Sequence, residues 1–420
     1  MTGRLLYDLT GLVHWYAYFR RPGGVQRVIE RVAACDVIRQ SPAVEFVVRI
    51  LGSDRFFRID PRALTDIGAL RRIHALGLRH ATLAGMLSEG RYFHLPYLAR
   101  GWAQHARASL VIAPPPGAGD TLFNPGDLWW QRRYAERIGG LKERTGLRLV
   151  QMIHDLYLIE RPEWTPAAEV RVFADQLAAI APVVDRWLVT SQFMKDRIED
   201  YIGGRSLPAR PITVLPMGWD SLADAAQGKA RVEQPYILFV GTVEPRKNLS
   251  ALLDAMAELR TRLGPRVPRL VVVGGPGWKA GDVEARLARQ SREGSALWLK
   301  NVSDAELATL YRGARFTVMP SLGEGYGLAV QESIAQGVPC IAAATGGTRE
   351  AGGDLASYFD PSQPGDLTRA IAAWITDDAA LAEARAKIAR ALSAGQFASW
   401  NDAGKLLLSL SLEEASWRLH

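Results

Sequence analysis

The sequence predicts an α/β protein of two doubly wound domains that face each other across a cleft. Short apolar runs alternate with amphipathic segments, as in a parallel sheet with helices on both faces. The alternation stops in residues 217–234, which are rich in alanine, glycine and charge, and then restarts. A chain of 420 residues, 48% of them hydrophobic, is long enough for two cores. We therefore expect one domain in residues 1–216, a linker in 217–234 and a second domain in 235–400.

The first half of the chain has six predicted strands. Apolar residues recur at helical spacing behind the pair Gly23-Gly24, so a helix follows the first strand. Thr165 is the expected N-cap of a helix that has Pro166 in its first turn and runs to about residue 183, and Ser191 is the expected cap of the next helix. The predicted strands lie at residues 5–9, 44–51, 120–130, 147–155, 186–190 and 212–216.

The second half repeats the pattern. A helix of residues 249–263 follows its first strand, and further helices carry residues 283–287, residues 305–312 and Glu332. The predicted strands lie at residues 236–240, 270–273, 297–299, 316–320 and 339–342.

Composition excludes several classes of protein. Cys35 and Cys340 lie far apart and outside any metal-binding spacing, as in a reducing compartment without structural disulfides. The N-terminus resembles no signal peptide, and no apolar run approaches the ~20 residues of a membrane-spanning helix. No nucleic-acid-binding module occurs. We expect a cytoplasmic protein, at most peripheral on the cytoplasmic face of the membrane.

The net charge of +7 lies entirely in the first hundred residues, which hold 15 Lys and Arg against 8 Asp and Glu. A one-sided basic face suits an anionic membrane surface, an acidic acceptor or nucleic acid. The alternative is an arginine-rich composition on a solvated face. Residues 70–80 are apolar and basic by turns at helical spacing, so this segment either contacts the inner membrane leaflet or packs its apolar side on the core.

The glycine-rich segment 320–332 is the leading candidate for the chemistry. It joins a strand to a helix, and its glycines allow backbone to approach a ligand while the helix start offers N–H groups to a phosphate. Glu324 would repel that phosphate, so we expect it to face a hydroxyl-rich or cationic group. Glu332 lies about two helical turns further on, on nearly the same face. Two carboxylates beside a phosphate turn indicate a sugar-nucleotide site.

Other candidate residues follow other strands. Arg246 and Lys247 lie just past the first strand of the second domain, where they can neutralise a diphosphate. His154 and Asp155 end a strand of the first domain, also at the edge where ligands bind. The alternative there is a structural histidine beside a capping aspartate. The turn at Gly23-Gly24 places a helix N-terminus against a ligand.

Together these segments resemble a known family. Gly-Thr-Val-Glu-Pro-Arg-Lys-Asn at 241–248, followed by Glu-Gly-Tyr-Gly-Leu at 324–328 and a second glutamate, is similar to the retaining glycosyltransferases of family 4. Supporting matches are the Gly-Gly pair, Ile-His-Asp at 153–155, Leu-Pro-Met-Gly-Trp-Asp at 215–220, and Phe397 with Trp400. The resemblance implies the GT-B fold, with two Rossmann-like domains and a final helix at 402–420 that packs back onto the first domain.

The resemblance also implies a role for each candidate. Glu324, His154 and Lys247 are implied as catalytic, with Glu324 supporting charge near the anomeric carbon and His154 contacting the donor sugar from the opposing domain. Gly23, Gly24 and Asp155 are implied on the acceptor side. The implied donor-binding residues are Arg246, Lys247, Gly274, Val302 (against the base), Glu324, Gly325, Tyr326, Gly327, Leu328 and Glu332 (on the ribose).

The family also implies a mechanism. Thr242 stands where many members carry an arginine, and Arg246 is the candidate replacement. We expect a front-face displacement in which the leaving diphosphate accepts the proton of the acceptor. No Asp-x-Asp occurs in the chain, so we expect no metal and no cofactor besides the nucleotide sugar.

The resemblance favours GDP-mannose or a related GDP-sugar as donor, with UDP-sugars left open. It favours a glycan or lipid-linked glycan of cell-surface polysaccharide or lipopolysaccharide synthesis as acceptor. Two other functions stay open: a sugar-nucleotide epimerase or hydrolase, which needs no acceptor, and a non-enzymatic nucleotide-sugar-binding scaffold. A scaffold, however, has no physical need for a carboxylate beside a phosphate turn.

Overall fold

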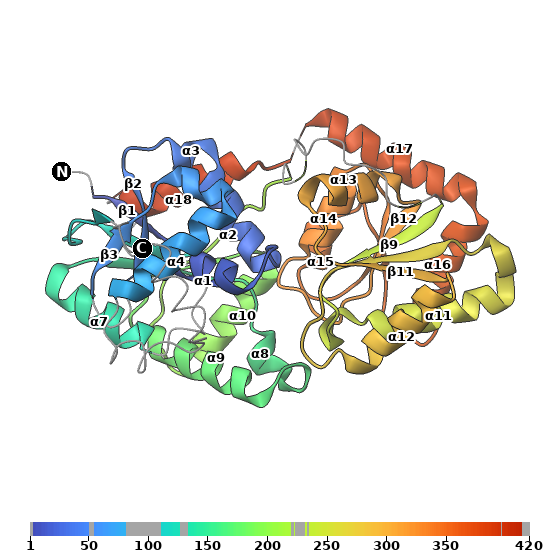
Figure 1. Cartoon of the computed structure of the whole chain (residues 1–420), viewed down its shortest axis with the longest axis horizontal. Helices are drawn as coiled ribbons and strands as arrows, with labels where there is room; N and C mark the ends of the chain where they lie inside the picture. Colours follow the sequence, from blue (N-terminus) through green and yellow to red (C-terminus); the bar gives the residue numbers. More distant parts are fainter. Residues whose placement is uncertain are drawn as a thin grey trace.

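The computed structural model shows two α/β lobes, each built on its own sheet (Figure 1). It describes residues 3–49, 54–80, 111–126, 133–219, 222, 232, 235–395 and 397–413. The first sheet has the strand order β4-β3-β2-β1-β5-β6-β7-β8, and the second has the order β11-β10-β9-β12-β13-β14. Within the described residues, all strand pairs are parallel apart from β2–β3 and β3–β4. Two doubly wound parallel sheets are thus confirmed.

The first sheet contains the predicted strands and two that the sequence did not reveal. The additional strands, β3 and β4, are three and two residues long, too short for a hydrophobic period to show. β5 ends before Pro125, which has no N–H for a ladder, and residues 127–130 lie outside the described part. The strands are β1 (Leu5–Asp8), β2 (Val44–Arg49), β3 (Phe56–Arg58), β4 (Val111–Ile112), β5 (Thr121–Asn124), β6 (Arg148–Ile153), β7 (Arg186–Val189) and β8 (Ile212–Val214).

The helices of the first domain correct one predicted cap. Ser191 caps α10 as expected, because its Oγ accepts from the Met194 N–H at 3.0 Å. The prediction for Thr165 is wrong: α9 begins at Ala167 with Pro166 extended in the cap position, and it ends before Pro182, which restricts the residue ahead of it. The helices are α1 (Thr10–Tyr18), α2 (Gly24–Ala34), α3 (Asp36–Arg39), α4 (Ile67–His80), α7 (Tyr134–Thr145), α8 (Tyr157–Glu160), α9 (Ala167–Ile180) and α10 (Gln192–Gly203).

The amphipathic segment at 70–80 is helix α4, and its apolar side faces inward. Leu70 and Ile73 belong to the same core cluster as Leu12 and Val13 of α1. Arg72, in contrast, is exposed. The apolar side of α4 is therefore occupied by core packing and is not free to lie in a membrane.

The second sheet has the strand order of a dinucleotide-binding fold, in which the direction of winding reverses between the first and fourth strands. Here those two neighbours are β9 and β12. The predicted strands and helices are all present, followed by β14 and α15 to α17, which the sequence did not reveal. The elements are β9 (Tyr236–Val240), α11 (Leu249–Leu263), β10 (Arg269–Val273), α12 (Gly281–Arg292), β11 (Ala296–Leu299), α13 (Asp304–Gly313), β12 (Phe316–Met319), α14 (Leu328–Ala335), β13 (Cys340–Ala343), α15 (Thr348–Gly352), β14 (Ser357–Phe359), α16 (Asp366–Thr376) and α17 (Asp378–Ala394).

The second sheet is buried on both faces. Alternate residues of β9 belong to different cores, Ile237 and Phe239 to one and Tyr236 and Leu238 to the other. This explains why the strands are continuous apolar runs in the sequence. The carboxyl ends of the strands are consequently left as the edge where ligands can reach the sheet.

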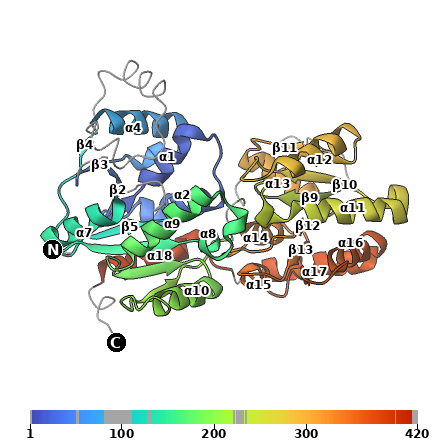
Figure 2. The ribbon, with the colours of Figure 1, turned by 90° about the horizontal axis from the view of Figure 1, so that it is seen from below.

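The last helix, α18 (Trp400–Leu412), returns to the first domain. In Figures 1 and 2 it lies in the lobe of β1 to β8, and it packs on α2, α3 and β1. Close packing requires a glycine at one point, since a Cβ on Gly404 would lie 2.6 Å from Cys35 Sγ. The predicted return of the chain is therefore seen, while most of the predicted linker and residues 414–420 lie outside the described part. The exact domain boundaries stay a prediction.

Candidate active site

The two sequence segments singled out for chemistry meet at one point of the second sheet. Arg246 and Lys247 follow β9, in a short turn of 3₁₀-helix (Pro245–Lys247), and Glu324 follows β12. β9 and β12 are neighbours, and the strand order reverses between them. Such a reversal opens a crevice at the carboxyl ends of the strands, where α/β proteins bind ligands.

Glu324 is the centre of a paired charge cluster. Its Oε1 lies 2.5 Å from Lys247 Nζ, and its Oε2 lies 2.9 Å from Arg246 Nη1. Arg246 also donates to Glu244 Oε1 and to the Gly323 carbonyl, both at 2.9 Å. Each of the four charged side chains is less than one-fifth exposed. The cluster contains two cations and two anions, so its charges are balanced before a ligand binds.

Electrostatics keep Glu324 ionised. Burial acts to raise its pKa, but Lys247 and Arg246 outweigh this effect and lower the pKa of Glu324 to about 2. For Arg246, burial likewise disfavours the charge, and Glu324 and Glu244 more than compensate, so its pKa is raised. Glu324 is thus a fixed negative charge that can stabilise positive charge developing on a nearby atom.

Arg246 is held by two carboxylates and a carbonyl, whereas Thr242 lines the cavity without a charge. These contacts orient the Arg246 guanidinium toward Glu324. Its predicted role as a replacement for an arginine at position 242 stays a prediction.

The glycine-rich turn between β12 and α14, predicted to bind phosphate and called the phosphate turn below, has the expected backbone conformation. Gly327 has φ of 109°, a left-handed conformation that favours glycine, and it precedes α14, whose first turn has no side-chain cap and no acidic residue. An uncapped helix start leaves N–H groups for an anion. Gly325 is required by a close approach, because a Cβ there would lie 1.9 Å from the His154 carbonyl of the opposing domain. Ser191 Oγ also donates to the Gly325 carbonyl at 2.5 Å.

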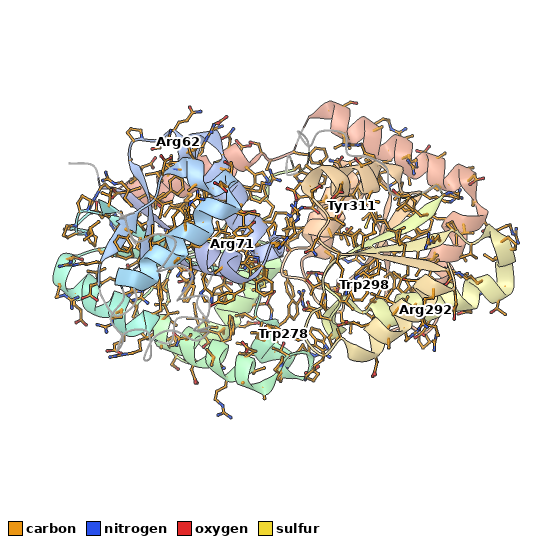
Figure 3. All side chains as sticks on the ribbon, in the orientation of Figure 1. Arg62, Arg71, Trp278, Arg292, Trp298 and Tyr311 are labelled. Carbon is orange, nitrogen blue, oxygen red and sulfur yellow. The ribbon has the colours of Figure 1, made fainter. Side chains whose placement is uncertain are left out.

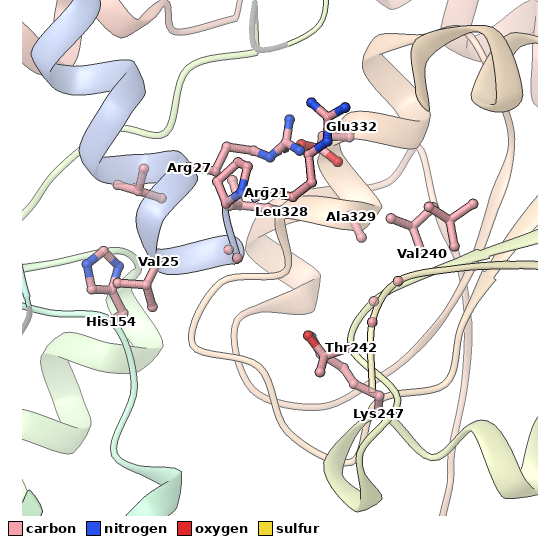
Figure 4. A pocket seen from close by; sticks show the side chains of 18 of the residues that line it. Arg21, Val25, Arg27, His154, Val240, Thr242, Lys247, Leu328, Ala329 and Glu332 are labelled. Atoms are coloured by element: carbon pink, nitrogen blue, oxygen red, sulfur yellow. Dashed lines mark ion pairs between the residues drawn. The ribbon is translucent and has the colours of Figure 1, made fainter. Parts of the chain in front are cut away.

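His154 faces the turn from the first domain. Its Nε2 lies 2.7 Å from the Pro125 carbonyl, which only accepts, so Nε2 carries the hydrogen and Nδ1 has a lone pair. Burial lowers the pKa of His154, with partial compensation from the Pro125 hydrogen bond, so the ring is neutral at pH 7. Figure 4 shows His154 and Val25 on one side of the pocket and Lys247 and Thr242 on the other.

One carboxylate oxygen of Glu332 has a hydrogen-bond partner among the described residues, and the other has none. Tyr311 Oη donates to its Oε2 at 3.1 Å, while its Oε1 is buried without a hydrogen-bond partner. Arg27 Nε of α2 lies 3.6 Å from Oε1 (Figure 4). Arg27 also pairs with Asp304 at 3.2 Å. Burial raises the pKa of Glu332, and Arg27 partly counteracts it. Glu332 Oε1 is therefore a buried acceptor at the edge of the cavity that no hydrogen bond among the described residues uses.

One cavity of about 430 Å³ brings the predicted site residues together. Gly274 closes one wall, since a Cβ there would lie 2.0 Å from the Gly241 carbonyl. The sequence missed Arg27, although an arginine three residues after a glycine pair was the signal available for it. The predicted residues that line the cavity are Gly23, Gly24, His154, Asp155, Arg246, Lys247, Gly274, Val302, Glu324, Gly325, Tyr326, Gly327, Leu328 and Glu332. Residues that the sequence did not single out also line it, among them Trp15, Arg20, Arg21, Arg27, Asn301 and Asp304.

Contacts across the cleft hold the two walls together. Glu350 of α15 accepts from the backbone N–H groups of Gln192 at 2.6 Å and Phe193 at 2.8 Å. A carboxylate of the second domain thus caps helix α10 of the first. On another part of the cleft, Arg31 pairs with Asp304 at 2.7 Å. Charged contacts therefore join the two domains at two places along the cleft.

Comparisons with known proteins decide the family. The model of the family "Glycosyl transferases group 1" matches residues 220–392. D-inositol 3-phosphate glycosyltransferase 1 of Catenulispora acidiphila is 32% identical over 300 residues, which cover 65% of this chain and 69% of that protein. The chain belongs to the group 1 glycosyl transferases. Its predicted resemblance to this family is confirmed.

Other proteins to which the chain is similar differ in length. The serotype-specific mannosyltransferase WbdA of Escherichia coli is 29% identical over 240 residues, which are 53% of this chain and 29% of WbdA. Sucrose-phosphate synthase from Thermosynechococcus elongatus superposes with a TM-score of 0.62 at 18% identity, covering 97% of this chain and 98% of that one. This superposition supports the predicted GT-B fold. The chain therefore spans less than a third of the length of WbdA, whereas it covers nearly the whole of the sucrose-phosphate synthase structure.

Neither a metal-binding cluster nor a membrane-spanning helix is found in the part of the chain that the structure describes. No group of three or more His, Cys, Asp or Glu side chains there is arranged to hold a metal ion. No helix of the described part is both long and apolar enough to cross a bilayer.

Proposed function

We propose that this protein transfers a hexose from a nucleoside diphosphate sugar to a glycan, with retention of configuration. The observation that carries the proposal is Glu324, ionised between Lys247 and Arg246 and placed beside an uncapped helix start, with neutral His154 across the cavity. A fixed anion there can stabilise positive charge at the anomeric carbon, and the helix start can stabilise the departing diphosphate.

The proposed reaction is a front-face displacement. The bond between the anomeric carbon and the diphosphate oxygen breaks as the acceptor hydroxyl oxygen bonds to the same carbon from the same face. The hydroxyl proton passes to the leaving diphosphate, and the nucleoside diphosphate departs. Lys247 and the N–H groups of Gly327 and Leu328 would stabilise the leaving group, and Glu332 would hold the ribose through its unsatisfied Oε1.

The donor is proposed to be GDP-mannose or a related GDP-sugar. The similarity to mannosyltransferases, including O-antigen chain mannosyltransferase B of E. coli at 29% identity over 245 residues, supports this choice and a role in cell-surface polysaccharide synthesis. The similarity to proteins named D-inositol 3-phosphate glycosyltransferase supports a second, different specificity. A UDP-sugar is the alternative donor.

A binding panel tests the donor. The protein is heated with GDP-, UDP-, ADP- and dTDP-sugars over a concentration series, and the midpoint of unfolding is followed. A ligand at about 100 times its Kd adds roughly 2.7 kcal/mol to stability, so the true donor stands out. A rise for GDP-mannose alone supports the proposal, a rise for a UDP-sugar alone replaces the donor, and no rise for any sugar nucleotide contradicts the function.

Incubation with the donor alone separates the rival enzymes. An epimerase would yield an altered sugar nucleotide, and a hydrolase would yield free sugar at the full rate without acceptor. A scaffold would bind the nucleotide sugar and yield neither product in any mixture. The transferase requires an acceptor for rapid turnover.

The proposal includes metal independence, because the charge on the diphosphate is assigned to Lys247 and a helix start. Activity is measured with and without EDTA. Equal rates are expected, and loss of activity that Mg²⁺ or Mn²⁺ restores would contradict this part.

We also propose that the protein works in the cytoplasm on a glycan acceptor, lipid-linked where the membrane is involved. The excess of basic residues in the first hundred positions would then supply peripheral contact with the anionic inner leaflet. Because the apolar side of α4 is buried in the core, such contact would be electrostatic. Binding to anionic liposomes at low salt and release at high salt are expected. Failure to bind at low salt would remove the membrane contact and leave a soluble acceptor.

A further inference from the structure

A second cavity of about 170 Å³ adjoins the site. Val25, His154, Asp155 and Arg246 line both cavities, so the two share a wall. The rest of the second cavity is lined from both domains. Gly126 and residues between the end of β6 and α9 line one side, and the loops after β9 and β10 line the other. None of its lining residues belongs to the phosphate turn, and the proposed donor does not account for it.

The residues that line both cavities indicate which end of the proposed donor lies next to the second cavity. Glu332 and Val302, assigned to ribose and base, line only the larger cavity. His154 and Asp155, at the other end, line both. A nucleotide sugar with its ribose on Glu332 and its hexose near Glu324 therefore points its hexose toward the second cavity. A molecule that reacts with the anomeric carbon can reach it from there.

The lining of the second cavity suits a sugar ring. Four aromatic side chains line it: Tyr157, Trp164, Phe173 and Trp278. Figure 3 shows Trp278 at the border between the two lobes. Aromatic faces pack against the apolar C–H faces of a pyranose, while nearby polar groups take its hydroxyls. A volume of about 170 Å³ is below the ~300–1,000 Å³ of sites for drug-sized ligands, so it suits one ring.

Charge in the second cavity disfavours an anion. Among the residues that the structure describes, its lining holds two carboxylates, on Asp155 and Glu244, against one cation, Arg246. Arg246 is already paired with Glu244 and Glu324. Arg161 and Lys279 lie beyond the lining, and both contact Glu163. Because Glu244 belongs to the balanced cluster of Arg246, Lys247 and Glu324, Asp155 supplies the excess negative charge that a phosphate or carboxylate in the cavity would face.

We propose that the second cavity is the acceptor subsite, and that it takes an uncharged pyranose unit and rejects sugars that carry phosphate or carboxylate. This inference rests on the proposed transferase function. Aromatic faces position the ring, and Asp155 and Glu244 accept from its hydroxyls. One hydroxyl then forms the new bond to the anomeric carbon and gives its proton to the leaving diphosphate.

The test measures transfer from the donor identified by the binding panel to a set of acceptor sugars. The probes are methyl α-mannoside, mannose 6-phosphate, glucuronate and inositol 3-phosphate. Methyl α-mannoside is expected to have a kcat/KM at least about tenfold above each charged probe, since like charges in one pocket are strongly unfavourable. Preference for a charged probe would overturn the inference.

Variants locate the subsite. Trp278→Ala is expected to raise the acceptor KM about tenfold, a change of about 1.4 kcal/mol, while donor KM and the slow hydrolysis of donor by water stay unchanged. Trp278→Phe, the matched control, keeps an aromatic face and should recover most of the acceptor KM. Glu244→Gln should narrow the discrimination against mannose 6-phosphate. An unchanged acceptor KM in Trp278→Ala would place the acceptor elsewhere.

The two proposals fail differently. If the donor binds and is slowly hydrolysed but charged sugars are the better acceptors, only the acceptor inference is overturned. If no donor binds or reacts, the transferase function falls, and this inference falls with it.

Discussion

The two walls of the cleft differ in where their charged side chains find partners. The wall from the second domain is self-contained, because Glu324, Lys247 and Arg246 satisfy one another within one domain. The wall from the first domain is completed only by the other, because Arg27 finds its acidic partners Glu332 and Asp304 across the cleft. The charged side chains proposed to act on the donor are therefore held in place within the second domain. The first domain contributes contacts that depend on closure of the cleft. Changes in the second domain should lower turnover, and changes in the first should weaken donor binding.

The largest loss is expected for Lys247→Ala. This change removes a cation that is proposed to stabilise the leaving diphosphate, and of the two cations paired with Glu324 it leaves Arg246 alone. A lost electrostatic contact of this kind costs about 100- to 1,000-fold in kcat, measured as the steady-state rate of nucleoside diphosphate release. The matched control is Lys387→Ala, which removes a lysine paired with Asp354 away from the cavity. Equal loss in both variants would show that stability, and not the site, was affected.

Acid should weaken the second-domain wall. The pKa of Glu324 is about 2 in the folded protein and about 4.3 in an unfolded chain. The stabilising effect is therefore complete above about pH 5 and is lost as the pH falls through 2. It amounts to the order of 3 kcal/mol, measured as the free energy of unfolding of wild type minus that of Glu324→Gln at each pH. A difference that is constant from pH 7 to pH 2.5 would contradict the pairing.

A change in the first-domain wall should affect binding more than chemistry. Arg27→Met removes the cross-cleft cation of Glu332 and one of the two cations that pair with Asp304, so the closed cleft is less favourable. We expect the donor KM to rise about tenfold with kcat reduced much less, from initial rates over a donor series. Arg31→Met is the control, because Arg31 pairs with Asp304 but does not line the cavity. If Arg27→Met lowers kcat and leaves KM unchanged, the division of roles between the walls is wrong.

The smallest expected effect concerns two cap residues of the first domain. Ser191→Ala should cost about 1 kcal/mol of stability, because Ser191 caps α10 and contacts Gly325 of the other domain. Thr165→Ala should cost less, since Thr165 caps no helix. Chemical unfolding of the two variants measures the difference. A larger loss for Thr165→Ala would reverse the assignment of the caps.

The sequence predicts the second domain better than the first. Strands such as β9 and β10 are continuous apolar runs because both faces are buried, so they stand out without structural information. β3 and β4 form a short antiparallel edge with no periodicity of its own. β14 was missed for a similar reason, since it has only three residues.

The site follows the same division. Glu324 and Lys247 could be placed together because parallel strands end at one edge of a sheet. Arg27 could not, since its partners lie in the other domain and far along the chain, and only the arrangement of the two domains brings them together. The Gly325 contact with His154 is of the same kind. Sequence patterns therefore identified the residues of each wall, and the structure supplied the contacts between the walls.

The most direct test of the central claim is the rate of hexose transfer in Glu324→Gln. This variant keeps the size of the side chain and removes the charge that is proposed to stabilise the anomeric centre. With donor and acceptor saturating and donor binding confirmed by thermal shift, we expect the rate to fall about 100-fold or more. A Glu324→Gln protein that binds donor and transfers sugar at close to the wild-type rate would contradict the account.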